Sequence, residues 1–79
     1  MMVEHAEPKP FYVRYPGGRI VECIEVGGEG SDVIADVDEA GTVVGIEILD
    51  VNVPQSVALA RGFAEARGLT FPDSVGPAA

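Results

Sequence analysis

The residue types best suited to chemistry lie in one acidic stretch. Asp36, Asp38, Gly41 and Glu47 occupy positions one, three, six and twelve of a calcium-binding EF-hand loop. Position five is Ala40, however, which has no side-chain oxygen, and the flanking residues alternate as strands do, whereas an EF-hand needs two helices. We therefore expect a β-turn with an acidic rim and no bound metal, and we keep Asp36, Asp38 and Glu47 only as weak metal-ligand candidates.

The same three carboxylates are the candidates for acid–base chemistry. Asp36 and Asp38 are expected to share one face of a strand, which Glu47 can approach. General acid–base catalysis needs carboxylates in a cleft that shifts their pKa values, and a sheet in so short a chain offers little cleft. We therefore expect that the protein is not an enzyme. The competing hypothesis is a small-ligand or divalent-metal-binding domain that uses this acidic turn.

The remaining reactive residue types form no catalytic set. His5 has no serine or cysteine nearby, and a nucleophilic site needs base and nucleophile held together. Cys23 lies between Glu22 and Ile24, without the positive neighbour that a reactive thiolate requires. Residues 27–30 are rich in glycine but lack the Lys-Ser/Thr pair of a phosphate-binding loop. No catalytic or cofactor-binding residue is predicted, and no cofactor is expected.

Length and charge narrow the classes of protein and partner. The 79 residues fit one domain, and the hydrophobic content of 47% is typical of a folded chain. A formal net charge of -8 disfavours binding to nucleic acid or to an anionic membrane surface, but suits a basic protein partner. The first ten residues lack a signal-peptide core, and Cys23 is the single cysteine, so we expect a cytoplasmic protein.

The pattern along the chain predicts an α+β fold: a four-stranded antiparallel β-meander with one C-terminal helix packed on one face. Glycine-rich turns separate short apolar runs that we expect to form strands at 11–15, 20–26, 33–38 and 43–49. The period then changes to that of a helix over 54–67, with Pro54 in its first turn and Gly68 as its stop. Residues 1–10 are predicted to be a flexible arm, 11–50 the β-meander and 72–79 a flexible tail.

The apolar face of the predicted helix is centred on Leu59, Phe63 and Ala66 and is widened by three smaller residues, Val57, Ala60 and Ala64. Gly62 lies within this helix. It weakens the helix by about 1 kcal/mol relative to alanine, unless it permits close contact with the sheet.

The register between the third and fourth strands has two solutions. A type I turn with a bulge at Gly41 pairs Asp38 with Thr42, and so Asp36 with Val44. A longer loop pairs Val37 with Val44 and Ala35 with Ile46. We prefer the longer loop because it matches apolar residues to apolar residues, although a slip of one residue exchanges the two faces of a strand.

The stretch from Val33 to Asp50, VIADVDEAGTVVGIEILD, resembles the bacterial family called domain of unknown function 2283. Members carry a strand that ends in Asp, an acidic turn with Gly, and a Val-Gly-Ile-Glu-Ile-Leu run, here Asp36, residues 38–41 and residues 44–49. With a first strand like that of Phe11 to Tyr15, the resemblance covers about half of the chain. Just before the first strand, family members carry a Tyr-Asp and an Ala-Asp pair, and this chain has residues 7–10 there instead. The predicted helix lies outside the family pattern. The resemblance implies a fold but no activity.

One helix covers one face of a sheet, so the other face should carry some of the apolar residues Val21, Cys23, Val43 and Leu49. We therefore expect self-association, as a homodimer paired through a sheet face or an edge strand. The expected function is that of a protein-binding or regulatory module, in its most specific form an antitoxin-like component that covers a small basic protein.

Overall fold

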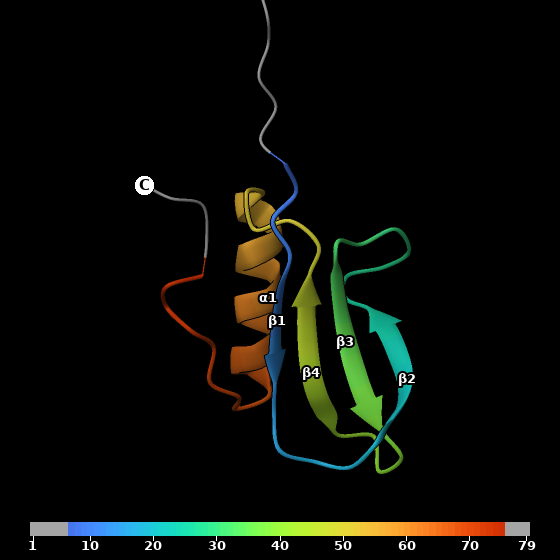
Figure 1. Ribbon diagram of the computed structural model, residues 1–79. Helices are drawn as coiled ribbons and strands as arrows, with labels where there is room; N and C mark the ends of the chain where they lie inside the picture. The colour runs from blue at the N-terminus through green and yellow to red at the C-terminus, as the bar shows by residue number, and fades with distance from the viewer. Residues whose placement is uncertain (1–6, 76–79) are drawn as a thin grey trace, which may run out of the picture.

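The computed structural model of the protein describes residues 7–75. These residues form four strands followed by one helix, which confirms the α+β class, and both ends of the described chain lie at the same end of the sheet (Figure 1). The elements are β1 (Phe11–Arg14), β2 (Ile20–Glu25), β3 (Val33–Asp38), β4 (Val43–Ile48) and α1 (Pro54–Ala66). His5 and the outer parts of the predicted arm and tail lie outside the described residues.

The strand order corrects the predicted meander. All neighbouring strands are antiparallel, but their order is β1-β4-β3-β2 rather than the sequential order of a meander. Only β2, β3 and β4 follow one another as hairpins. The chain leaves β1 and crosses the end of β4 and β3 before it enters β2 (Figure 1). We name residues 15–19 the crossing loop.

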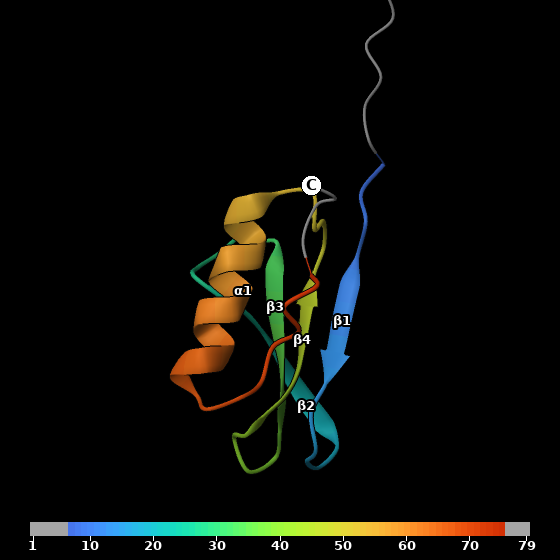
Figure 2. The ribbon, with the colours of Figure 1, turned by 90° about the vertical axis from the view of Figure 1, so that its left-hand side faces the viewer.

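Burial of the first strand explains this order. Phe11 and Val13 pair with Ile48 and Ile46, which are both fully buried, so β1 extends the apolar face of β4. The segment that follows the helix returns between α1 and β1 (Figure 2) and places Phe71 edge-on to Phe11, with 6.0 Å between the ring centroids. A first strand next to β2 would lie away from this cover, since α1 contacts β3 and β4.

The turn between β3 and β4 is the tight turn of the first solution, so the longer loop that we preferred is wrong. The Asp38 N–H donates to the Thr42 carbonyl at 3.0 Å, and the Gly41 N–H donates to the Asp38 carbonyl at 2.9 Å. Gly41 has φ 81°, which glycine adopts without the steric cost that a side chain would add. These features define a type I turn with a glycine bulge.

Beyond the turn, Asp36 pairs with Gly45 rather than with the Val44 of the first solution, and the strands follow the second solution in part. Ala35 pairs with Ile46, as predicted, but Val37 pairs with Val43 instead of Val44, so that predicted pair is wrong. Val44 is an additional residue in β4 that forms a β-bulge. The tight turn alone would shift the pairing of β3 with β4 by one residue. The additional residue of the bulge corrects this shift, so that apolar residues of the two strands pair with each other.

The helix packs on one face of the sheet, as predicted, and contacts β3 and β4 there. Its buried residues are Ser56, Val57, Ala60 and Ala64. The predicted stripe is therefore displaced, because Leu59 and Ala66 are exposed. Small side chains at the contact let the helix axis approach the sheet, and the larger Leu59 is left at the side of the interface.

The core lies between this helix and the sheet. It combines alternate residues of β3 and β4 with the buried face of α1, and its fully buried members are Val33, Ala35, Ile46, Ile48, Ala60 and Ala64. Val43, one of the residues expected on the open face, also belongs to this core. Among residues 7–75, no helix has the length and apolar character that crossing a membrane requires.

Candidate functional site

The face of the sheet opposite the helix carries a small polar cluster centred on Asp36. The Tyr12 hydroxyl donates to Asp36 Oδ2 at 2.7 Å, and the Cys23 thiol donates to Asp36 Oδ1 at 3.1 Å. Gly45 of β4 lies between β1 and β3, and a Cβ atom there would overlap the Tyr12 hydroxyl. Glycine at this position is therefore what allows the tyrosine to reach across β4 to the carboxylate.

Within this cluster, Asp36 favours the protonated forms of the Tyr12 hydroxyl and the Cys23 thiol. Burial and the hydrogen bond to Asp36 raise the pKa of Tyr12 above its ordinary value. The hydrogen bond to Asp36 is also the main cause of the raised pKa of Cys23, since a thiolate beside a carboxylate is disfavoured. Cys23 is exposed. It is thus an accessible thiol whose reactive thiolate form is disfavoured.

Asp38 has a structural role at the end of the sheet. One carboxylate oxygen accepts the N–H groups of Ala40 and Thr42 at 3.0 and 2.9 Å, and the other accepts the N–H of Gly18 at 3.0 Å. The bond from Gly18 is the first cause of the lowered pKa of Asp38, because amide donors stabilise the charged form. Asp38 therefore ties the crossing loop to the β3–β4 turn.

The three candidate carboxylates share the open face, as expected from the sequence. Asp36 pairs with Gly45, and Glu47 pairs with Ile34 one step further along the same face. Within residues 7–75, no group of three His, Cys, Asp or Glu side chains converges in a way that could hold a metal ion. The oxygens of both aspartates already accept protein donors, so a metal would have to displace those bonds.

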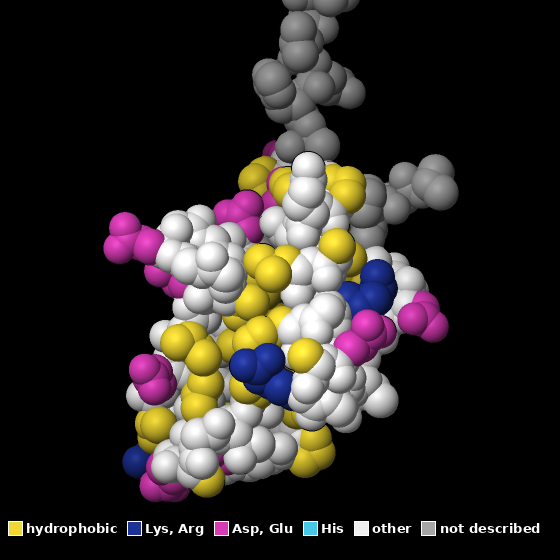
Figure 3. Space-filling model, turned by 180° about the vertical axis from the view of Figure 1, so that it is seen from behind, with side chains coloured by type: hydrophobic (Ala, Val, Ile, Leu, Met, Phe, Trp, Pro, Cys, Tyr) yellow, Lys and Arg dark blue, Asp and Glu magenta, His cyan; other side chains and the backbone are white. Residues whose placement is uncertain are grey.

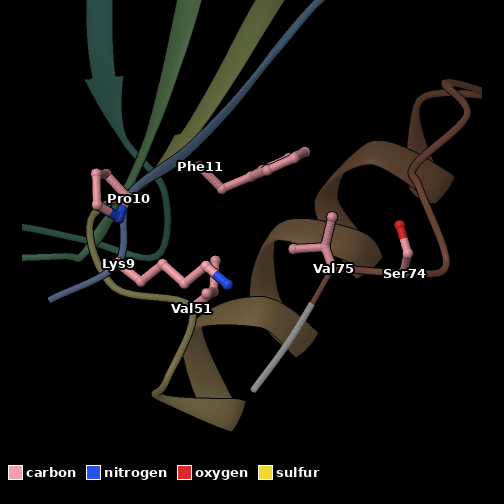
Figure 4. Close-up of a pocket in the computed structure, with 6 residues that line it drawn as sticks. All are labelled: Lys9, Pro10, Phe11, Val51, Ser74 and Val75. Atoms are coloured by element: carbon pink, nitrogen blue, oxygen red, sulfur yellow. The ribbon is translucent and has the colours of Figure 1, made fainter. Parts of the chain in front are cut away.

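Two shallow cavities lie away from these carboxylates. The first, of about 220 Å³, is lined by Lys9, Pro10, Phe11, Val51, Ser74 and Val75, where β1 meets the segment after the helix (Figure 4). The second, of about 240 Å³, lies beside Thr42, Arg67 and Leu69. Neither is lined by Asp36, Asp38 or Glu47. Both volumes fall below those of typical small-molecule sites.

The sheet has two edge strands, β1 and β2, and the edge along β2 is the more exposed of the two. All six residues of β2 are exposed, and β2 ends the strand order, so one of its sides has no neighbouring strand. Val21 is 54% exposed, Ile24 40% and Leu59 of the adjacent helix 40%. Leu59 lies next to Gly27, just after the strand, and Figure 3 shows apolar side chains gathered in the middle of this helix side of the molecule. We refer to β2 and Leu59 together as the β2 edge.

Sequence reasoning placed β2 inside a meander and so did not identify this edge. Ile20, Glu22, Ile24 and Val26 are spaced two residues apart, so they share one face of the strand, and three of the four are apolar, as in a half-buried strand. Only Val26, just beyond the strand, is buried. The one available signal was the pair of glutamates within so short an apolar strand, since charged residues protect natural strand edges.

The fold defines a small α+β domain, and its sequence identifies the family. The chain belongs to the family described as Protein of unknown function (DUF2283), whose profile matches residues 11–52. That match covers all four strands and ends before the helix. Neither a curated protein nor a solved structure gave a significant match to the chain.

Proposed function

We propose that the protein is a non-enzymatic protein-binding module that receives an extended segment of a partner along the β2 edge. The observation that carries this proposal is the exposure of the whole of β2 at the end of the sheet. Unpaired backbone groups of an edge strand are the sites at which strand addition occurs, and exposed Val21 and Ile24 add apolar area.

The charge supports a basic partner. A net charge of -8 on 79 residues accelerates encounter with a basic protein and opposes binding to nucleic acid and to anionic membranes. An antitoxin-like component that covers a small basic protein is the most specific form of this proposal. The lone, accessible Cys23 supports a reducing, cytoplasmic setting.

We also propose that the free protein self-associates as a dimer through the same edge. An isolated apolar edge strand can pair with a second copy about a two-fold axis. Val21, Ile24 and Leu59 would lose solvent exposure in such a pair. Self-pairing and partner binding then compete for one site. Sedimentation equilibrium that gives only the monomer mass of 8.2 kDa at high micromolar concentration would contradict the dimer.

The test compares two substitutions of similarly exposed residues. Ile24→Lys places a charge on the β2 edge, whereas Leu49→Lys changes a residue that is 44% exposed and lies just after β4. The tagged wild type and both variants are used to retain proteins from native cell extract at low and high salt. We expect a salt-sensitive basic protein with the wild type and Leu49→Lys, and its loss with Ile24→Lys. Equal retention by both variants would show that the partner binds elsewhere.

A further inference from the structure

Resting on the proposed function, we infer that the β2 edge selects a strand with two cationic residues three positions apart, which lie opposite Glu22 and Glu25. The residue facing Ile24, next to the cation opposite Glu25, is apolar. From the residue opposite Glu25 to the residue opposite Glu22, the partner strand therefore carries a cation, an apolar residue, any residue and a second cation.

The backbone of the edge determines which residues can receive this strand. The Val26 N–H donates to the Val33 carbonyl at 2.9 Å, so Val26 bonds toward β3. Bonding groups alternate along an antiparallel strand, which directs those of Ile24 toward β3 and those of Cys23 and Glu25 away from it. Cys23 therefore presents its N–H and C=O groups, and Glu25 its N–H, on the outer side of β2, whereas the Glu25 carbonyl already accepts the N–H of Gly28 at 3.4 Å.

The side chains of the edge point to two faces that each carry one carboxylate. Glu22 and Ile24 pair with Val37 and Ala35 of the core, so they lie on the helix side of the sheet. Cys23 and Glu25 lie on the open side, where Cys23 pairs with Asp36. Opposite charges that face each other across strands attract, and like charges repel. A complementary strand thus needs one cation on each face, and the separation of Glu22 from Glu25 places these cations three residues apart.

Three of the protein's four arginines contact groups other than these two carboxylates. Arg61 lies over the Phe71 ring at 5.3 Å and Arg67 over the Phe63 ring at 3.7 Å from the centroids. The Arg14 guanidinium donates to the Gly18 carbonyl at 2.9 Å. Glu25 is held at the edge because its Oε1 accepts the N–H of Gly30 at 3.2 Å.

A second copy of the chain is a poorer occupant than a basic strand. The segment from Ile20 to Glu25 contains no lysine or arginine, so the β2 of another copy offers no cation to either glutamate. Pairing Cys23 with Glu25 across the dimer sets Ile24 against Ile24, which gains apolar contact but leaves both carboxylates without a counter-charge. A basic strand should therefore displace the second copy.

The inference is tested by selection from a randomised library of octapeptides displayed on phage, panned on the wild-type protein and counter-selected on Ile24→Lys. We expect enriched peptides to carry Lys or Arg three positions apart with an apolar residue beside one of them. Synthetic versions should shift the NMR signals of the Cys23 and Glu25 amides. Their affinity should fall about 2- to 30-fold in the variant Glu22→Gln/Glu25→Gln, from two cross-strand pairs.

Charge reversal separates the inference from the proposed function. With Glu22→Lys/Glu25→Lys we expect selection of Asp or Glu at the same spacing, whereas selection of the same basic peptides would overturn the inference. Peptides that require the edge but show no charge spacing would also overturn it and leave strand addition intact. If no peptide dissociates the dimer, the β2 edge is the binding site of a second copy and the inference is overturned. If no peptide prefers the wild type over Ile24→Lys and the wild type sediments as a monomer, the proposed function itself fails.

Discussion

Asp38 accepts the backbone N–H of Gly18 at 3.0 Å, a bond that joins the crossing loop to the β3–β4 turn. The loop also covers the bulge, because Gly17 lies so close to the side chain of Val44 that a Cβ atom would overlap it. Val44 is fully buried as a result. One carboxylate, kept from the sequence only as a weak metal-ligand candidate, therefore stabilises the connection that sets the strand order.

The stability contributed by Asp38 should depend on pH. Its folded-state pKa lies below the ordinary 3.8, so the contribution is present above that value and is lost as the pH falls through the lowered folded pKa. We expect Asp38→Asn to destabilise the protein at neutral pH, and the difference from wild type to shrink in acid. Urea unfolding between about pH 7 and pH 2 measures this difference. Glu39→Gln, in the same turn but exposed, is the control, and a difference that is constant with pH would contradict the prediction.

Gly45→Ala should destabilise the protein by about 1–3 kcal/mol, because the new methyl group displaces the Tyr12 side chain from Asp36. The effect should depend on the tyrosine. In a Tyr12→Ala background we expect most of the cost of Gly45→Ala to disappear, which a double-mutant cycle of urea unfolding free energies measures. An unchanged cost in that background would place the strain elsewhere in β4.

Cys23 should react slowly for an exposed thiol, because its hydrogen bond to Asp36 raises its pKa. Asp36→Asn removes the negative charge, so we expect a faster reaction with a disulfide reagent at about pH 8, with the midpoint of the pH–rate profile moved to lower pH. Glu39→Gln should leave the profile unchanged. An identical profile in Asp36→Asn would show that the carboxylate does not control the thiol.

Gly62→Ala should stabilise the protein by up to about 1 kcal/mol, since a Cβ atom there meets no neighbouring atom within 4 Å and the helix favours alanine. Of the two alternatives considered for Gly62, the close contact with the sheet is thus wrong. Gly41→Ala is the matched opposite, because φ of 81° penalises any side chain, and it should destabilise. Thermal unfolding of both variants tests the pair. A loss of stability in Gly62→Ala would contradict the open space around that residue.

Local features of this fold followed from the sequence, and long-range ones did not. The bounds of β3 and the proline at the start of α1 depend on neighbouring residues, and the structure confirms both. The partner of β1 depends on which apolar surfaces meet after folding, such as Phe11 with Phe71, and alternation within one strand carries no information about it. For the same reason the sequence identified Asp36 as notable but could not link it to Tyr12, which meets it only because β1 lies beside β4.

The crossing loop also has a consequence for the order in which the molecule assembles. The hairpins of β2, β3 and β4 close over short stretches of chain, whereas β1 joins Phe11 to Ile48 and pays the larger entropy of a long loop. We expect β1 to dock last and to detach first, so its amides should exchange with solvent before those of β3. When β1 detaches, β4 becomes the edge strand on that side of the sheet. At high concentration, two molecules could then exchange their first strands and form an interlocked pair that needs no contact at β2.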